Sequence, residues 1–170
     1  EQRAQRRRRC FGDTAGVIVL AGSTWAGEEI FLAKLAGTSG DRRLRVVIAP
    51  RSRARFEEVA KALETVAASW SRWSEQKTRG HWDTDILLVD TLGDLKDLYG
   101  ACDIAFVGGS LNARGGQNPL EPAAAGVPVL FGPSMTNFHE EAADLKKAGG
   151  ARQARHAADV ASDIAELAAS

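Results

Sequence analysis

The 170-residue sequence has few of the residues on which disulfides and metal sites depend. It contains two cysteines, Cys10 and Cys102, and three histidines, His81, His139 and His156. This set suggests neither a disulfide framework nor a Cys/His zinc site, and no two histidines have the spacing of metal ligands on one helix face. We therefore expect no metal cofactor, and we expect Cys102 to be a small core residue.

The chain also lacks net charge and long apolar runs. Its 22 basic and 22 acidic residues cancel, so overall charge gives no reason to expect a nucleic acid as partner. No apolar run approaches the roughly 18 residues that a membrane-spanning helix needs, and no signal peptide is visible. We therefore expect this fragment to be soluble.

Positive charge is nevertheless concentrated within residues 1–15, which contain Arg3, Arg6, Arg7, Arg8 and Arg9. Such a run could contact anionic lipid or nucleic acid. We favour the simpler interpretation, which is a solvated linker or a first helix. Residues 16–170 then form one domain, which is long enough to bury a hydrophobic core.

Strand and helix patterns alternate along this domain, as is typical of a mostly parallel α/β sheet. Apolar runs predict strands at 17–21, 44–49, 86–90, 103–107 and 127–131, with shorter strands near 72–74 and 151–156. The intervening segments predict helices from residue 28 and at 53–68, 94–101, 119–125, 138–148 and 157–168. The expected fold is a doubly wound, Rossmann-like sheet.

Four loops follow the predicted strands, at 22–27, 50–53, 91–94 and 108–118. In doubly wound sheets, ligands bind outside the carboxyl ends of the strands. The four loops should therefore share one edge of the sheet and line one crevice.

The stretch FVGGSLNARGGQNPLEPAAAGVPVLFGP, residues 106–133, is a strand, a glycine-rich loop, a short helix and a second strand. Asn118 is a suitable N-cap, Pro119 suits the first helical position, and Glu121 falls where a capping box has its acid. A well-made helix start would explain these residues without a ligand. It would not explain the two glycine pairs of the loop, which allow a phosphorylated ligand to approach the backbone closely.

An arginine follows the predicted strand at 44–49. Pro50 ends the strand ladder, and the planar guanidinium of Arg51 then suits a phosphate or a carboxylate. The alternative is a surface arginine that is paired with a nearby acid. Additional candidate ligand contacts in the loops are Ser23, Gly109, Ser110 and Arg114.

These motifs resemble a known family. GGSLNARGGQNPLEPAAAGVPVLFGP is similar to the 3-deoxy-D-manno-octulosonic acid (Kdo) transferases of lipopolysaccharide assembly, which move Kdo from CMP-Kdo onto lipid A precursors. AGSTWAGEE at 21–29, IAPRSRARFEEV at 48–59 and LLVDTLGDLKDLYGACDIAFVGGS at 87–110 occur in the family's order. The resemblance covers nearly the whole chain but half of the enzyme, and it implies the C-terminal half of a GT-B glycosyltransferase.

The resemblance also implies a site for CMP, formed by Pro50, Arg51, Leu92, Gly93, Asp94, Asn118, Pro119, Leu120 and Glu121. Glu121 would accept hydrogen bonds from ribose hydroxyls. Asp94 stands where the family usually has glutamate, and Thr91 or Asp94 could instead cap the next helix. Trp25-Ala26 replaces a frequent His-Glu pair, so we assign no role to these two positions.

The family's general base, its acceptor site and its membrane contact belong to an N-terminal domain that this chain does not contain. We therefore expect no catalytic residue here, no metal requirement, and nucleotide binding without catalysis in the isolated domain. The complete protein would act on lipid A precursor at the cytoplasmic face of the bacterial inner membrane. A UDP-sugar transferase or epimerase domain and a non-catalytic nucleotide-binding module are the alternatives. Core packing and contact with another domain are the two alternative roles for Trp70, Trp73 and Trp82.

Overall fold

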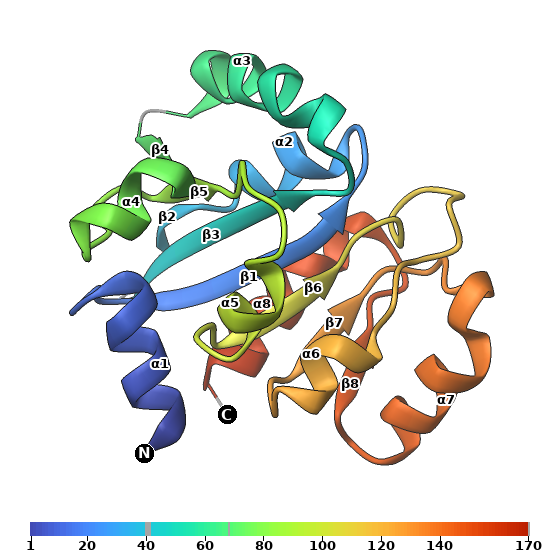
Figure 1. The fold of residues 1–170 in the computed structure, drawn as a ribbon. Coiled ribbons are helices and arrows are strands. Elements are labelled where there is room, and N and C mark those ends of the chain that lie inside the picture. The colour runs from blue at the N-terminus through green and yellow to red at the C-terminus, as the bar shows by residue number, and fades with distance from the viewer. Residues whose placement is uncertain (40–41, 68, 170) are drawn as a thin grey trace.

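The protein is described by a computed structural model that covers residues 1–39, 42–67 and 69–169. A central sheet carries helices on both faces (Figure 1). The strands are β1 (Val17–Thr24), β2 (Gly37–Ser39), β3 (Arg42–Pro50), β4 (Trp70–Arg72), β5 (Ile86–Leu88), β6 (Ile104–Val107), β7 (Val129–Phe131) and β8 (Ala151–Gln153). The α-helices are α1 (Gln2–Phe11), α2 (Glu28–Ala33), α3 (Phe56–Val66), α4 (Trp73–Arg79), α5 (Leu95–Tyr99), α6 (Leu120–Ala124), α7 (His139–Lys147) and α8 (Val160–Ala169).

The sheet has the order β4-β5-β3-β1-β6-β7-β8, and β2 pairs with β3. All neighbouring strands in this order are parallel, whereas β2 and β3 are antiparallel. Val19 in the central strand β1 pairs with Val46 on one side and with Ile104 on the other. The chain order reverses at β1, between β3 and β6, which is where doubly wound sheets bind ligands.

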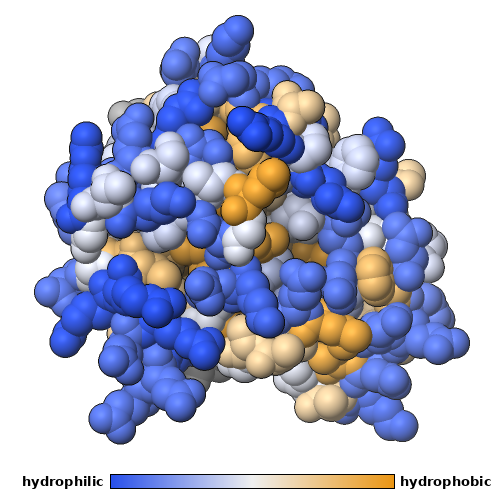
Figure 2. Space-filling model, in the orientation of Figure 1, coloured by the Kyte–Doolittle hydropathy of each residue, from blue (hydrophilic) through white to orange (hydrophobic). Residues whose placement is uncertain are grey.

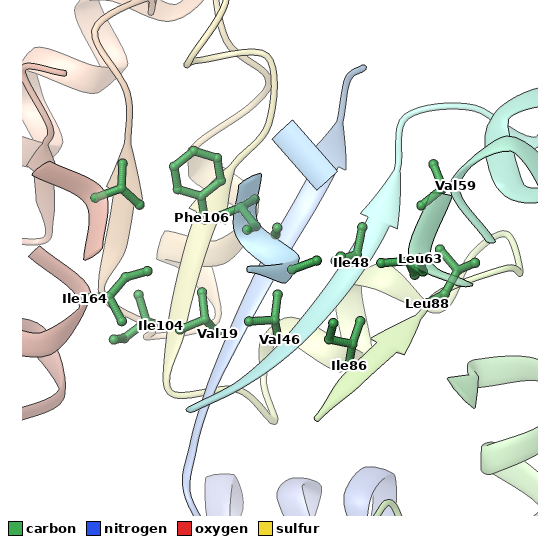
Figure 3. Close-up of a cluster of buried hydrophobic side chains, with 14 of the residues drawn as sticks. Val19, Val46, Ile48, Val59, Leu63, Ile86, Leu88, Ile104, Phe106 and Ile164 are labelled. Atoms are coloured by element: carbon green, nitrogen blue, oxygen red, sulfur yellow. The ribbon is translucent and has the colours of Figure 1, made fainter. Parts of the chain in front are cut away.

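Both faces of the sheet are buried, because successive strand residues point to opposite sides. One face packs Val19, Val46, Ile48, Ile104 and Phe106 against Leu63 of α3 and Ile164 of α8 (Figure 3). The other face packs Ile18, Leu20, Val47 and Leu87 against Phe11 of α1 and Leu98 of α5. This double burial explains why the strands have continuous apolar runs.

The predicted doubly wound α/β fold is confirmed, but the structure differs from the local predictions at four places. The short strand lies at Trp70–Arg72 instead of 72–74, and helix α4, which the sequence analysis did not predict, follows it directly. Strand β2 was also missed, and residues 53–55 form a 3₁₀ turn before α3 begins at Phe56. The predicted ends at residues 68 and 170 lie outside the described residues. Helix α4 is short and mostly polar, so it shows little helical periodicity.

The arginine-rich segment forms helix α1, and its arginines fall into two groups. Arg3 and Arg7 pair with Asp103, and Arg3 also donates to the backbone oxygen of Cys102. The other arginines lie at the surface, where hydrophilic side chains cover the visible side of α1 (Figure 2). Among the described helices, none combines the length and the apolar composition that a bilayer crossing requires.

The C-terminal end of α1 is held in the core by aromatic contacts. Phe11 is fully buried, and its ring lies 6.3 Å from that of Trp73 and 5.3 Å from that of Trp82, centroid to centroid. Trp73 and Trp82 are themselves buried, while Trp70 is partly buried against the core of the opposite face. Core packing is therefore the role that the structure gives to Trp73 and Trp82.

We predict that Phe11→Ala lowers the free energy of unfolding by about 3–5 kcal/mol, because it leaves a cavity beside two tryptophans. Urea denaturation measures the change. Arg8→Ala is the control, since its pair with Asp13 is exposed and should contribute less than about 0.5 kcal/mol. Equal effects of the two substitutions would show that α1 does not depend on this aromatic contact.

Candidate functional site

A cleft of about 410 Å³ opens at the carboxyl ends of β1, β3 and β6. Its volume is in the range of small-molecule sites. Polar groups on its wall come from Ser23, Arg51, Gln117, Asn118 and Glu121, and apolar groups come from Leu95, Tyr99, Val107 and Phe138. Three of the four loops that were expected to converge, 22–27, 50–53 and 108–118, therefore meet here.

Arg51 directly follows β3 and lines the cleft. Its backbone N–H donates to the Thr24 oxygen at 2.9 Å, and its Nε donates to Oε1 of Gln117 at 3.0 Å. Within the described residues, Arg51 forms no ion pair with a carboxylate. The structure therefore does not show the alternative, an arginine paired with a surface acid. The terminal nitrogens of Arg51 are available to an anion.

Helix α6 begins one residue later than predicted. Pro119 is at the N-cap, and Oδ1 of Asn118 accepts a hydrogen bond from the Leu120 N–H at 2.9 Å. The Asn118 side chain thus closes a local turn before the helix, and Glu121 falls too early in the helix for a capping box. In the part of the chain that the structure describes, the Glu121 carboxylate has no partner, and it lines the cleft.

The glycine loop is held by a buried carboxylate at the start of α2. Glu28, in the first turn of α2, is 2% exposed. Its Oε2 accepts from the backbone N–H groups of Trp25 at 2.9 Å and Gly109 at 2.8 Å, and its Oε1 accepts from Leu111 at 3.1 Å. We call this contact the Glu28 clasp. It ties the β1–α2 turn to the β6–α6 loop.

The clasp changes what the predicted loop residues can offer a ligand. The Gly109 N–H is already used by Glu28. Ser110 is fully buried, and its hydroxyl donates to the Val107 oxygen at 2.5 Å and accepts from the Gly132 N–H at 2.8 Å. Gly108 has to be glycine, because a Cβ would lie 2.2 Å from the Ser23 oxygen. The Ser110 hydroxyl is thus used within the fold, and Gly108, Gly109 and Ser110 do not line the cleft.

Ser23 reaches the cleft through an irregularity in β1. The register with β3 shifts between Gly22 and Thr24, and Ser23 has a φ of 55°, which is uncommon for a residue other than glycine. Such bulges re-aim side chains at the ends of strands. Pro50 pairs with Thr24 across this shift and does not line the cleft.

The Leu92-Gly93-Asp94 loop lies beside the cleft instead of lining it. Leu92 is 70% exposed. Oδ2 of Asp94 accepts from Trp73 Nε1 at 2.9 Å, and it also bonds Thr91 and Lys77. Burial opposes ionisation of Asp94, but hydrogen bonds from Thr91, Trp73 and Lys77 prevail and lower the pKa of its carboxyl group. The contact of this loop with a nucleotide stays a prediction, and the Asp94 side chain anchors α4.

The other predicted residues, Arg114, Pro119 and Leu120, do not line the cleft. Leu120 is exposed, Pro119 is buried, and the Arg114 guanidinium lies 4.4 Å from the centre of the Trp25 ring. Among the described residues, no three His, Cys, Asp or Glu side chains gather as a metal site would need.

Two cleft residues with polar side-chain atoms were missed by the sequence analysis. Gln117 holds Arg51, and the signal for it was its place directly before Asn118. Tyr99, the chain's one tyrosine, projects from α5 to the floor of the cleft next to Gly22. Burial, with a smaller effect of the Glu121 and Cys102 charges, raises the pKa of its phenol, so the hydroxyl stays protonated.

Comparison with known proteins identifies the family. The chain matches no protein-family model. It is 36% identical over 148 residues to the 3-deoxy-D-manno-octulosonic acid transferase of Bordetella pertussis, covering 84% of this chain and 35% of that protein. The corresponding enzyme of Aquifex aeolicus is 30% identical over 154 residues, covering 89% of this chain and 42% of that protein.

A solved structure extends the match to the whole domain. The C-terminal CMP-Kdo binding domain of WaaA from Acinetobacter baumannii superposes with a TM-score of 0.84 and 30% sequence identity, over 99% of this chain and 88% of that one. The chain belongs to the Kdo transferase family. Its fold is that of the C-terminal half of a GT-B enzyme, and it spans about a third of the length of the Bordetella relative.

The Glu28 clasp of this Kdo transferase domain yields a prediction. Glu28→Gln replaces an acceptor oxygen by an amide that cannot accept, so at least one of the three backbone N–H groups loses its partner. We expect the free energy of unfolding to fall by about 1–3 kcal/mol and the amides of Gly109 and Leu111 to exchange hydrogen faster. Native-state hydrogen exchange measures both effects. Glu64→Gln, at an exposed position of α3, is the control. Unchanged protection in Glu28→Gln would contradict the clasp.

Proposed function

We propose that this chain binds CMP-Kdo as the donor-binding domain of a Kdo transferase. The observation that carries the proposal is the match, along 99% of the chain, to a domain that is described as CMP-Kdo binding. The cleft supports it independently, because of its volume and because its arginine and its carboxylate, which have no ion-pair partner in the described part of the chain, suit a nucleotide that carries both anionic and hydroxyl groups.

Within this proposal, Arg51 binds the phosphate of the donor. Transfer breaks the bond between the sugar carbon and the phosphate oxygen, and the leaving CMP keeps the electron pair. A guanidinium placed at that phosphate stabilises the developing negative charge. Arg51 suits this role because it has no carboxylate partner among the described residues and two terminal nitrogens to donate.

Glu121 and Asn118 hold the nucleoside in this proposal. A carboxylate accepts hydrogen bonds from two neighbouring ribose hydroxyls, and Glu121 lines the cleft with no partner for its oxygens among the described residues. Asn118 accepts a hydrogen bond from the Leu120 N–H and so fixes the first turn of α6, which positions Glu121. Pro50, Leu92, Gly93, Asp94, Pro119 and Leu120 complete the proposed CMP environment, with Ser23 as a further contact.

The reaction needs groups beyond those of this domain. A general base has to take the proton of the acceptor hydroxyl, and we propose that it comes, with the site for the lipid A precursor, from an N-terminal domain. We propose that the isolated domain binds donor without transferring it, and that Arg51 takes the charge-neutralising role that a metal ion would otherwise have at the phosphate. A lipid acceptor requires a membrane surface, and we propose that this is the cytoplasmic face of the inner membrane.

Calorimetric titration with CMP and UMP tests the proposal. We expect CMP to bind more tightly than UMP, and Arg51→Ala to weaken CMP binding by roughly tenfold or more, since it removes charge-assisted hydrogen bonds. Glu121→Gln should weaken CMP binding with an unchanged melting temperature. Arg53→Ala and Glu64→Gln are the controls, because both residues are exposed and lie outside the cleft.

Other results would point elsewhere. Tighter binding of UMP would favour a UDP-sugar transferase or epimerase. CMP binding that is insensitive to both Arg51→Ala and Glu121→Gln would show that the cleft is not the nucleotide site.

A further inference from the structure

The phenol of Tyr99 brings an unused polar group to the floor of the cleft. Tyr99 is the last residue of α5, is 3% exposed and lines the cleft. Its hydroxyl forms no hydrogen bond with the described residues. In the described part of the chain, two partnerless side-chain polar atoms are sealed from solvent, and the Tyr99 oxygen is not one of them. The oxygen is therefore open to the cleft, and a ligand that covers it has to supply a hydrogen-bond partner.

Gly22 gives the hydroxyl its place. A Cβ on Gly22 would lie 1.8 Å from the Tyr99 hydroxyl oxygen and 2.7 Å from Cζ of the ring. The ring cannot move aside to make room, because it is packed among the buried apolar residues on one face of the sheet. Gly22 also lines the cleft. The lack of a side chain at this position in β1 therefore lets the phenol oxygen, instead of a methyl group, form part of the cleft floor.

The Tyr99 hydroxyl lies within electrostatic reach of the Glu121 carboxylate. Burial, and then the charge of Glu121, raises the pKa of the phenol, so the group keeps its proton and can donate. Both residues line the cleft, and among the described residues no hydrogen bond joins them. The cleft therefore holds an acceptor and a neutral donor, each available to the same ligand.

We propose that Tyr99 donates a hydrogen bond to the oxygen of a ribose hydroxyl, the same hydroxyl whose hydrogen Glu121 accepts, and that this pair selects nucleotides with an intact ribose. This inference rests on the proposed function, in which Glu121 binds the ribose. A hydroxyl has one hydrogen to give and two lone pairs on its oxygen. The carboxylate takes the hydrogen, and the phenol O–H serves a lone pair.

This arrangement makes the affinity depend on that hydroxyl. A site that is built to hydrogen-bond a ligand hydroxyl rejects the analogue without it, because the buried polar groups of the site are then left unpaired. A deoxy analogue would leave both the Tyr99 hydroxyl and one bond of the Glu121 carboxylate unmatched.

Isothermal titration calorimetry with CMP, 2′-deoxy-CMP and 3′-deoxy-CMP tests the contact, because each analogue lacks one ribose hydroxyl. The variant is Tyr99→Phe, which keeps the buried ring and removes the oxygen. The matched control is Thr65→Ala, which removes an exposed hydroxyl on α3 away from the cleft. Melting temperatures show whether the variants are folded, and Tyr99→Phe should not melt earlier, since the hydroxyl has no partner among the described residues.

We expect the unmodified chain to bind CMP more tightly than at least one of the analogues, by roughly tenfold or more. Tyr99→Phe should weaken CMP binding by roughly fivefold, the effect of one lost neutral hydrogen bond. It should change binding of the analogue that lacks the bonded hydroxyl by less than about twofold, which also identifies that hydroxyl. Thr65→Ala should leave all three affinities unchanged.

Several results would overturn the Tyr99 contact while CMP binding stands. These are equal affinity of the unmodified chain for all three ligands, no loss of CMP affinity in Tyr99→Phe, and equal losses for all three ligands in that variant. A lower melting temperature of Tyr99→Phe would show that the hydroxyl already has a partner within the fold and would also overturn it. Failure of the unmodified chain to bind any of the three would contradict the proposed function itself.

Discussion

The arrangement of the cleft depends on one buried carboxylate. Glu28 accepts hydrogen bonds from three backbone N–H groups, two of which lie more than eighty residues further along the chain. A buried carboxylate is stable only when its oxygens are satisfied, so the β1–α2 turn and the glycine loop have to stay in this relation. The same contact positions Trp25 and Gly109 side by side, and it links two of the loops that meet at the cleft.

Ion pairs within the fold determine which arginine side chains remain available to a ligand. Arg3, Arg55 and Arg72 each meet a carboxylate, so much of the chain's positive charge is neutralised within the fold. Arg51 and Arg114 form no such pair among the described residues, and both lie at the carboxyl edge of the sheet. A chain with a formal net charge of zero can therefore present a locally positive rim that attracts an anionic ligand.

The strands and the position of the cleft could be predicted, because they depend on the local pattern of the sequence. Strands such as Val17–Thr24 are buried on both faces and are recognisable as apolar runs, and the convergence of loops follows from a parallel sheet. Glu28 could not be predicted, because an acid in a first helical turn has a local explanation and its partners meet it only in the fold. Helix α4 was missed because the contacts that stabilise it, at Trp73 and Asp94, are also long-range.

The measurement that tests the central claim most directly is amide chemical-shift mapping of the domain during titration with CMP. The account predicts that the largest shifts occur at Ser23, at Arg51 and at 117–121, around the cleft at the carboxyl ends of the strands. Shifts confined instead to the apolar hollow of about 290 Å³ at the opposite edge, which Leu44 and Ile164 line, would contradict it.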